Sequence, residues 1–238
     1  MNNKQNGYSE LVKSDVPVKS VNRRNFLRGA GMTTVAGALV MASCKSNTDP
    51  VTPSNAVDLG SGDVGILNYA YALEQLEAAF YTQVIATPFS GMTDAEKSLL
   101  TDIRDHEIIH REFFKTALAA NAIPGLEVNF SAIDFTSRAS VLGTAKVFED
   151  TGISAYNGAG KLLKDANYLL LAGKIVSVEA RHSAAIRDLL QPNSALFAGD
   201  DVVDTTNGLD KATKPADILA AVQPFIKTKI SGANLPTA

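Results

Sequence analysis

Four stretches of this chain, between residues 63 and 190, carry an apolar stripe at helical spacing that ionisable side chains interrupt near its middle. Apolar residues recur every three or four positions over about 63–86, 93–120, 136–163 and 167–190, and strand-like alternation is not sustained anywhere in this region. A stripe of this kind marks the helix face that packs into a core. The chain is therefore predicted to be an all-α protein with four long helices.

The connections between these helices predict a bundle of two hairpins. Short links join the first helix to the second and the third to the fourth, so each pair is expected to be antiparallel. The link over residues 121–135 is long enough to cross the length of the bundle. Local signals mark the helix ends: Thr87-Pro88, a capping box at Thr93-Asp-Ala-Glu96, and Pro192. The bundle is assigned to residues 62–191, and residues 192–238 to a C-terminal loop and a short helix from about Pro215 to Lys229.

The side chains that interrupt the stripes are carboxylates and imidazoles. A carboxylate buried in a bundle core costs several kcal/mol unless something compensates it, and several carboxylates in one layer would also repel one another. A pair of divalent or trivalent cations would resolve that conflict. The groups concerned are Glu74 and Glu77 in the first stripe, Glu107 and His110 in the second, Glu149 in the third, and Glu179 and His182 in the fourth.

The order of these residues repeats between the two hairpins. Glu107 and Glu179 are each followed three positions later by a histidine, and Glu74 and Glu149 are each followed seven positions later by a tyrosine. The three-residue spacing places Glu and His one turn apart on one helical face, so both can reach one ion. One Glu from each of two helices, with Glu-x-x-His from each of the other two, is the ligand pattern of di-iron and di-manganese carboxylate sites.

Four segments together resemble the ferritin-like superfamily, in its secreted, desiccation-related branch: Asn68–Tyr81, Asp105–His110, Glu149–Tyr156 and Glu179–His182. The resemblance implies a ferritin-like four-helix bundle that binds two iron ions, or alternatively manganese. It further implies that Glu107 and Glu179 bridge the two metals, that Glu74 and His110 complete one site, and that Glu149 and His182 complete the other. Glu77, whose counterpart is Gly152, is a candidate extra ligand or a group directly behind the ligands, where Tyr81 and Tyr156 are also expected.

A competing motif overlaps the second stripe. Residues 106–110 satisfy His-Glu-x-x-His, which in metalloproteases places two histidines on one zinc ion beside a general-base glutamate. A zinc peptidase would need His182 as its third ligand, because the chain has only three histidines. It would also leave the other buried carboxylates without a role, so it is the weaker alternative. Under the di-metal interpretation, His106 lies one residue off the stripe and is expected either behind the ligands or exposed to solvent.

The N-terminal region differs from the rest of the chain in charge. Residues 1–44 hold six of the 22 Lys and Arg and two of the 25 Asp and Glu, which leaves 16 basic and 23 acidic residues and a net charge of −7. Residues 45–238, which carry this net charge of −7, are too acidic to be a good candidate for binding nucleic acid. Nucleic-acid binding needs clustered cations that contact phosphates.

Residues 1–43 resemble a twin-arginine signal peptide. Arg23-Arg24 precedes Phe26-Leu27 and an apolar run that is rich in Gly, Ala and Thr. The run ends at Cys44, in a segment that resembles a bacterial lipobox and implies a lipidated N-terminal cysteine. Residues 44–61 would then be a flexible tether, and the protein a lipoprotein of the periplasm or the outer membrane. The plainer interpretation is an ordinary N-terminal helix with an incidental cysteine.

These features predict an exported, lipid-tethered protein with a di-metal site. The leading expectation is an oxidoreductase that uses iron as a ferroxidase or consumes peroxide. A closely related expectation is catalase activity with manganese. The alternative is a stress- or desiccation-related metal-binding protein without turnover, because both functions need the same six ligands. The expected partners are metal ions, dioxygen or peroxide, and a membrane surface reached through lipidated Cys44.

Overall fold

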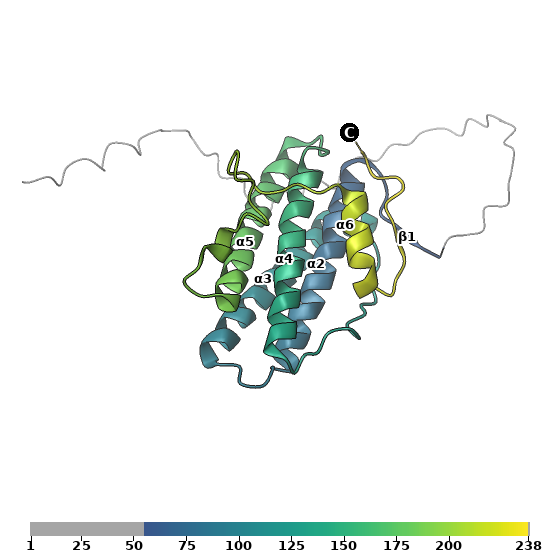
Figure 1. Ribbon diagram of the computed structural model, residues 1–238. Coiled ribbons are helices and arrows are strands. Elements are labelled where there is room, and N and C mark those ends of the chain that lie inside the picture. Colours follow the sequence, from purple (N-terminus) through teal and green to yellow (C-terminus); the bar gives the residue numbers. More distant parts are fainter. Residues whose placement is uncertain (1–54, 238) are drawn as a thin grey trace, which may run out of the picture. The chain divides into compact units, whose positions relative to one another are not determined.

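The computed structural model describes residues 55–237 of the chain (Figure 1). The predicted signal peptide, Cys44 and the first part of the predicted tether lie outside the described residues. Within residues 55–237, no helix is both long enough and apolar enough to span a membrane. The export and lipidation predictions stay predictions.

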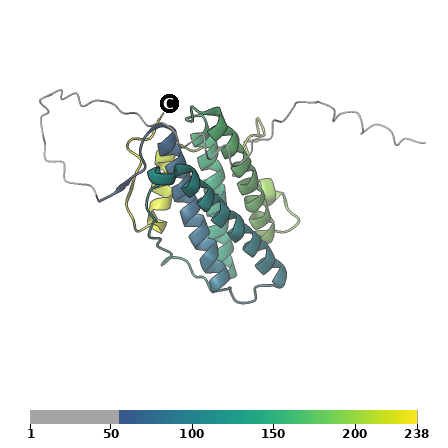
Figure 2. The same cartoon turned by 180° about the vertical axis from the view of Figure 1, so that it is seen from behind.

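Four long helices form the body of the described structure. They are α2 (Gly62–Ala86), α3 (Asp94–Leu118), α4 (Arg138–Gly160) and α5 (Ala166–Leu190). α2 packs along α3 and α4 packs along α5, so each pair is an antiparallel hairpin, and α2 contacts α4 between the hairpins (Figure 1, and from behind in Figure 2). The prediction of an all-α four-helix bundle is confirmed.

The start of α3 has the predicted capping box. The Thr93 hydroxyl accepts a hydrogen bond from Glu96 N at 3.2 Å, and the Glu96 carboxylate accepts one from Thr93 N at 2.9 Å. These bonds satisfy two amide groups that the first helical turn leaves without a partner. Glu96 also pairs with Arg138 Nε at 2.6 Å, which ties the first turn of α3 to the first turn of α4.

The link between the hairpins begins with the 3-10 turn η1 (Ala119–Asn121) and runs along α2. At one end Asn68, in the second turn of α2, donates to the carbonyl of Asn121 at 2.9 Å. At the other end Ser90, just beyond α2, donates its amide to the carbonyl of Thr136 at 3.1 Å. The chain therefore returns to the end of the bundle where α3 began before α4 starts. As a result α3 and α4 run parallel, which a long crossover makes possible.

An aromatic cluster fastens this crossover to the bundle. The ring of Phe80 on α2 is fully buried, and its centroid lies 5.1 Å from Phe148 on α4 and 6.0 and 5.9 Å from Phe130 and Phe135 in the crossover. Such pairs contribute about 0.5–1.5 kcal/mol each beyond the area that they bury. Phe80 and Tyr81 are neighbours and therefore lie about 100° apart around the helix axis. One face of α2 thus packs the crossover, while the adjacent face carries the ionisable stripe.

The C-terminal helix is shorter than predicted. α6 covers Pro215–Val222 instead of extending to about Lys229, and the 3-10 turn η3 (Gln223–Phe225) follows it. Pro224 has no amide hydrogen and its ring clashes with the preceding turn, so an α-helix does not continue through it. α6 packs against α4, on the same side of the bundle as the C-terminal segment (Figure 1).

The end of the predicted tether belongs to the folded unit. β1 (Val57–Asp58) pairs in parallel with β2 (Ile230–Ser231), and Leu59 is fully buried in the core. The Leu59 carbonyl also accepts a hydrogen bond from Asn68 Nδ2 at 3.1 Å. A flexible tether over residues 44–61 is therefore wrong for its last residues. These residues are ordered by pairing with β2, which lies near the other end of the chain. The polar composition of residues 44–61 does not indicate this partner strand.

The loop after α5 is held by a buried arginine. Arg187 on α5 is fully buried and forms paired hydrogen bonds of 2.7–3.0 Å with Asp150 on α4 and with Asp201 in the loop. Its remaining N–H donates at 3.0 Å to the carbonyl of Leu196, in the 3-10 turn η2 (Ala195–Ala198). All five guanidinium donors are used, so the loop is fixed against the outer side of α4 and α5.

Candidate metal centre

The six predicted ligands lie in two groups of four that share two members. The first group is Glu74, Glu107, His110 and Glu179, and the second is Glu107, Glu149, Glu179 and His182. In each group, one ligand atom from every residue lies within 4.8 Å of the others. Either group could hold a metal ion. The shared members are the two glutamates that the resemblance assigned as bridges.

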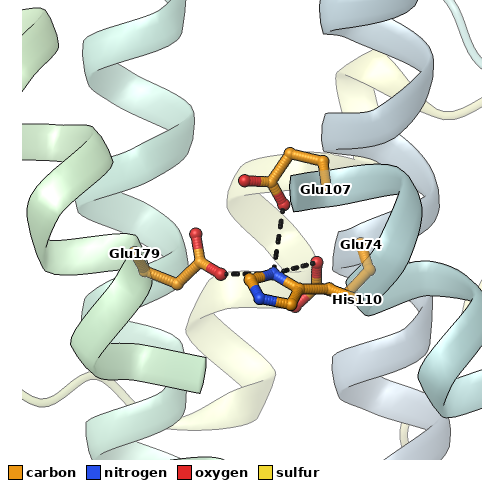
Figure 3. Close-up of side chains that lie close together, drawn as sticks. All are labelled: Glu74, Glu107, His110 and Glu179. Atoms are coloured by element: carbon orange, nitrogen blue, oxygen red, sulfur yellow. Dashed lines mark ion pairs between the residues drawn. The ribbon is translucent and has the colours of Figure 1, made fainter. Parts of the chain in front are cut away.

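The first group is centred on His110 (Figure 3). Glu107 and His110 come from one face of α3, three residues apart, while Glu74 reaches in from α2 and Glu179 from α5 (Figure 3). The Nδ1 atom of His110 lies 2.9 Å from Glu179 Oε1, 3.5 Å from Glu74 Oε2 and 3.7 Å from Glu107 Oε2.

The second group repeats this arrangement around His182. The Nδ1 atom of His182 lies 2.8 Å from Glu107 Oε1, 3.3 Å from Glu179 Oε2 and 3.6 Å from Glu149 Oε2. Glu107 and Glu179 thus each direct one carboxylate oxygen toward His110 and the other toward His182. A carboxylate that offers one oxygen to each of two groups is placed as a bridge between them.

Burial makes this arrangement costly without a cation. Four of the carboxylates are at most 1% exposed, namely Glu74, Glu107, Glu149 and Glu179. Eight buried atoms of the two groups have no hydrogen-bond partner in the described part of the chain: Glu74 Oε2, both oxygens of Glu107, His110 Nδ1, Glu149 Oε2, both oxygens of Glu179 and His182 Nδ1. The short distances among them lack the angles of hydrogen bonds. Buried polar groups are rarely left unpaired, so a bound cation is the expected partner of these atoms.

Two tyrosines occupy the remaining carboxylate oxygens. The hydroxyl of Tyr81 on α2 donates to Glu149 Oε1 on α4 at 2.5 Å, and the hydroxyl of Tyr156 on α4 donates to Glu74 Oε1 on α2. Burial and the adjacent carboxylates raise the pKa of both phenols, so they stay protonated and act as donors. Each tyrosine thereby leaves its glutamate with one unpaired oxygen.

The crosswise pairing follows from helix geometry. Seven residues along an α-helix are about 10.5 Å, which is too far for a direct hydrogen bond between Glu74 and Tyr81 or between Glu149 and Tyr156. Antiparallel packing of α2 against α4 instead brings the tyrosine of each helix opposite the glutamate of the other. The seven-residue spacing, combined with the predicted topology, contained this signal.

The charges of the cluster redistribute protons among its members. Burial lowers the pKa of both histidines, but the surrounding carboxylates outweigh it and raise the pKa of His110 and of His182 to about 12. Burial likewise raises the pKa of Glu149 to about 8 and that of Glu74 well above its ordinary value. For Glu107 the two histidines outweigh burial and lower the pKa to about 2. Without a cation, the cluster therefore binds protons in its place.

Glu77 is buried beside the cluster but belongs to neither group. Its carboxylate has no hydrogen-bond partner among residues 55–237, and burial together with Glu107 and Glu149 raises its pKa well above the ordinary value. A Cβ atom on Gly152 would lie 3.0 Å from Glu77 Oε1. The glycine therefore makes room for this carboxylate on the facing helix.

A second glycine of α4 serves close packing elsewhere. A Cβ atom on Gly158 would lie 1.8 Å from the carbonyl oxygen of Thr213, whose amide donates to Ser154 O at 2.9 Å. Gly152 and Gly158 thus permit close approach of neighbouring groups to α4.

His106 does not take part in a zinc site of the metalloprotease type. Its Nδ1 atom lies 2.9 Å from Nε2 of His182, and no candidate ion group within the described residues includes it. His110 faces the carboxylates instead, so the two histidines of the His-Glu-x-x-His motif do not converge on one point. The sequence predicted that His106 lies behind the ligands or is exposed, but it did not identify His182 as the neighbour of His106.

Comparison with protein families agrees with this geometry. The sequence profile of the family described as "Ferritin-like domain" matches residues 62–192, which is more than half of the 238 residues and includes all six candidate ligands. A comparison with curated proteins finds no match.

Proposed function

Since the chain belongs to the ferritin-like domain family, we propose that its bundle binds a pair of iron ions and uses them as an oxidoreductase. Export and attachment to a membrane surface are parts of the same proposal. The substrate we propose is peroxide or dioxygen, with ferrous iron as the second substrate if the reaction is that of a ferroxidase.

One observation carries the two-ion proposal: the distribution of unpaired carboxylate oxygens. Glu107 and Glu179 have two unpaired oxygens each, as a bridging ligand needs, whereas Glu74 and Glu149 have one each because a tyrosine holds the other. A single ion would leave several of these buried oxygens uncompensated. Two ions, one in each group, would use all eight unpaired atoms.

The donor set favours iron. It contains four carboxylates and two imidazoles and no thiolate, whereas structural zinc sites are tetrahedral and built mainly from Cys and His. Imidazole suits iron, and carboxylate oxygen suits manganese as well, so manganese is the alternative metal. When bound, a pair of ferrous ions supplies two electrons in all, one from each ion.

The residues of the chain would position and insulate such a pair. The four carboxylates offset the positive charge of the ions, and their burial excludes bulk water, which strengthens electrostatic interactions inside the bundle. Tyr81 and Tyr156 hold Glu149 and Glu74 in fixed orientations through their hydroxyl groups. Such support behind the ligands commonly changes metal affinity by about 10–100-fold.

The depth of burial favours a second candidate, a metal-binding protein without turnover. The ligand carboxylates are at most 1% exposed, and the side chains of His110 and His182 are 12% and 5% exposed. A site so enclosed also suits an ion that stabilises the fold in a stress- or desiccation-related protein. The two functions predict different assay results, although they share their ligands.

Elemental analysis and two activity assays test the proposal. Wild type is expected to contain about two metal ions per chain, while Glu107→Ala and Glu179→Ala lose both because each removes a bridge. Glu112→Ala, on the half-exposed side of α3, is the matched control and should keep its metal. Equal metal content in all four proteins would overturn the proposal. Aerobic ferrous oxidation or peroxide decay by wild type supports the enzyme, and bound metal without either supports the second candidate.

The proposed location rests on the N-terminal sequence. The twin arginines, the apolar run and Cys44 support export through the twin-arginine route and acyl chains on Cys44, in the periplasm or at the outer membrane. Labelling with a radioactive fatty acid tests the anchor. Wild type should incorporate the label and partition with membranes, whereas Cys44→Ser should do neither. A Cys44→Ser protein that still partitions with membranes would count against lipid anchoring.

A further inference from the structure

His106 makes a direct contact with the candidate metal centre without belonging to it. It lies on α3 immediately before Glu107, is exposed, and places Nδ1 2.9 Å from Nε2 of His182 on α5. The two ring centroids are 5.1 Å apart and the ring planes lie within 9° of parallel. This centroid separation is close to the nitrogen–nitrogen distance plus the two ring radii, so the nitrogens face each other along the line between the rings.

The opposite nitrogen of His182 determines what this contact does. Its Nδ1 atom faces the carboxylates and has no hydrogen-bond partner, so it is the nitrogen available to an ion. A nitrogen that binds a metal carries no proton, and the proton of a neutral imidazole then resides on the other nitrogen. Nε2 of His182 would therefore donate to Nδ1 of His106.

We infer that His106 is a positioning residue, which accepts the Nε2 proton of His182 and so holds that ring in the tautomer that binds metal through Nδ1. The inference rests on the proposed two-metal function and adds that the two metal positions differ in affinity. An acceptor behind a ligating histidine fixes its orientation and raises its basicity, and its loss costs about 10–100-fold in metal affinity. The position that includes His182 is thus the tighter one.

The internal repeat provides the comparison within the same chain. His106 directly precedes the Glu-x-x-His of α3, and the half-buried Val178 directly precedes that of α5. Val178 is thus the counterpart of His106 in the repeat, and its apolar side chain cannot accept a hydrogen bond from His110. Nε2 of His110 has no hydrogen-bond partner in the described part of the chain. One ligand histidine has an outer acceptor, and the other does not.

This difference supplies matched substitutions. His106→Val removes the acceptor behind His182 and makes the two repeats alike at this position. Val178→His offers a corresponding acceptor to His110. His106→Asn is the conservative variant, because Asn Oδ1 takes nearly the place of imidazole Nδ1 and still accepts a hydrogen bond.

Titration of the metal-free full chain with Co²⁺, followed by visible absorption, measures the affinities. Wild type is expected to bind two Co²⁺ ions in two steps. His106→Val should weaken the tighter step by about 10–100-fold and leave the weaker step unchanged, while His106→Asn should stay within a few-fold of wild type. Val178→His should strengthen the weaker step, and a gain of this kind cannot arise from misfolding.

Proton NMR of the Co²⁺-loaded protein adds a readout that a purely structural role would not move. The ring N–H protons of ligating histidines are shifted by the paramagnetic ion, and a hydrogen-bonded one exchanges slowly with water. Wild type should show one slow signal, from His182, which is lost in His106→Val and kept in His106→Asn.

The outcomes separate this inference from the proposed function. Two Co²⁺ ions bound with equal affinity by wild type and His106→Val would overturn the inference and leave the two-metal site intact. An equal loss in the Val and Asn variants would also overturn it, since His106 would then act as a ligand. Failure of wild type to bind Co²⁺ would overturn both.

Discussion

Replacing Glu149 with glutamine is expected to stabilise the metal-free protein while it impairs the metal site. Burial, supported by the charges of Glu107 and Glu179 and opposed by His182, raises the pKa of Glu149 to about 8 from an ordinary value of 4.5. At pH 7 the folded protein therefore keeps a proton on Glu149 that the unfolded chain has released. Holding this proton costs stability, and glutamine removes the cost.

The size of this gain in stability follows from the difference between pH 7 and the ordinary pKa of a glutamate. Between an ordinary pKa of 4.5 and pH 7 lie about 2.5 pH units, each worth about 1.4 kcal/mol, so Glu149→Gln should gain about 3 kcal/mol of unfolding free energy at pH 7. Because the folded-state pKa is raised, the gain is nearly absent at pH 4.5, grows as the pH rises, and levels off above about 8. Glutamine has the shape of the protonated glutamate and still offers an oxygen to the Tyr81 hydroxyl.

Urea unfolding of chelator-treated protein, followed by circular dichroism at pH 5, 6 and 7, measures this gain. Glu112→Gln, at a half-exposed position of α3, is the control and should change stability by less than about 0.5 kcal/mol. Saturating metal should reverse the order, because it stabilises the wild-type protein more than a variant that lacks one ligand. A variant that is less stable than wild type at pH 7 without metal, or a gain that does not change between pH 5 and 7, would refute the reasoning.

Three further predictions concern the surroundings of the site. Tyr81→Phe leaves Glu149 Oε1 without its donor and should lower metal affinity by about 10–100-fold in a Co²⁺ titration, with little change in far-UV circular dichroism. The two ligand histidines have pKa values raised to about 12, so metal binding at pH 7 should release about two protons or more, measured by calorimetry in buffers of different ionisation enthalpy. Arg187→Met removes the paired hydrogen bonds to Asp150 and Asp201 and leaves Lys146 as the cation that contacts both carboxylates. Breaking a buried ion pair costs about 3–5 kcal/mol; since Asp201 is half-exposed and Lys146 remains, we expect about 2–3 kcal/mol by urea unfolding.

The positions of the candidate ligands could be predicted because their signal is local. Whether Glu107 and His110 share a helix face depends only on three-residue spacing, and the capping box at Thr93 depends on four consecutive residues. The pairing of the helices needed only the lengths of the links. The convergence of four stripes at one depth then followed from the topology of the bundle.

Features that join distant segments could not be predicted in this way. Asp201 meets Arg187 through a loop of irregular conformation, and no periodicity relates the two positions. Leu59 is buried because β1 finds its partner strand near the other end of the chain. α6 stops early at a proline that the apolar spacing alone does not weigh. For Asp201 and Leu59 the decisive contact lies outside the window that helical spacing covers, whereas the proline after α6 is a local signal that the predicted helix ignored.

The internal repeat also shows where the two halves of the site differ. Glu77 on α2 faces Gly152 on α4, so one half carries an extra buried carboxylate, whose pKa is raised by burial and by the charges of Glu107 and Glu149. His106 contacts His182, which belongs to the same group as Glu149. Both departures from symmetry therefore act on one metal position. A carboxylate that gives up its proton when an ion binds nearby and an added hydrogen-bond acceptor each favour a cation there, so we expect the ions to bind one after the other, beginning beside His182.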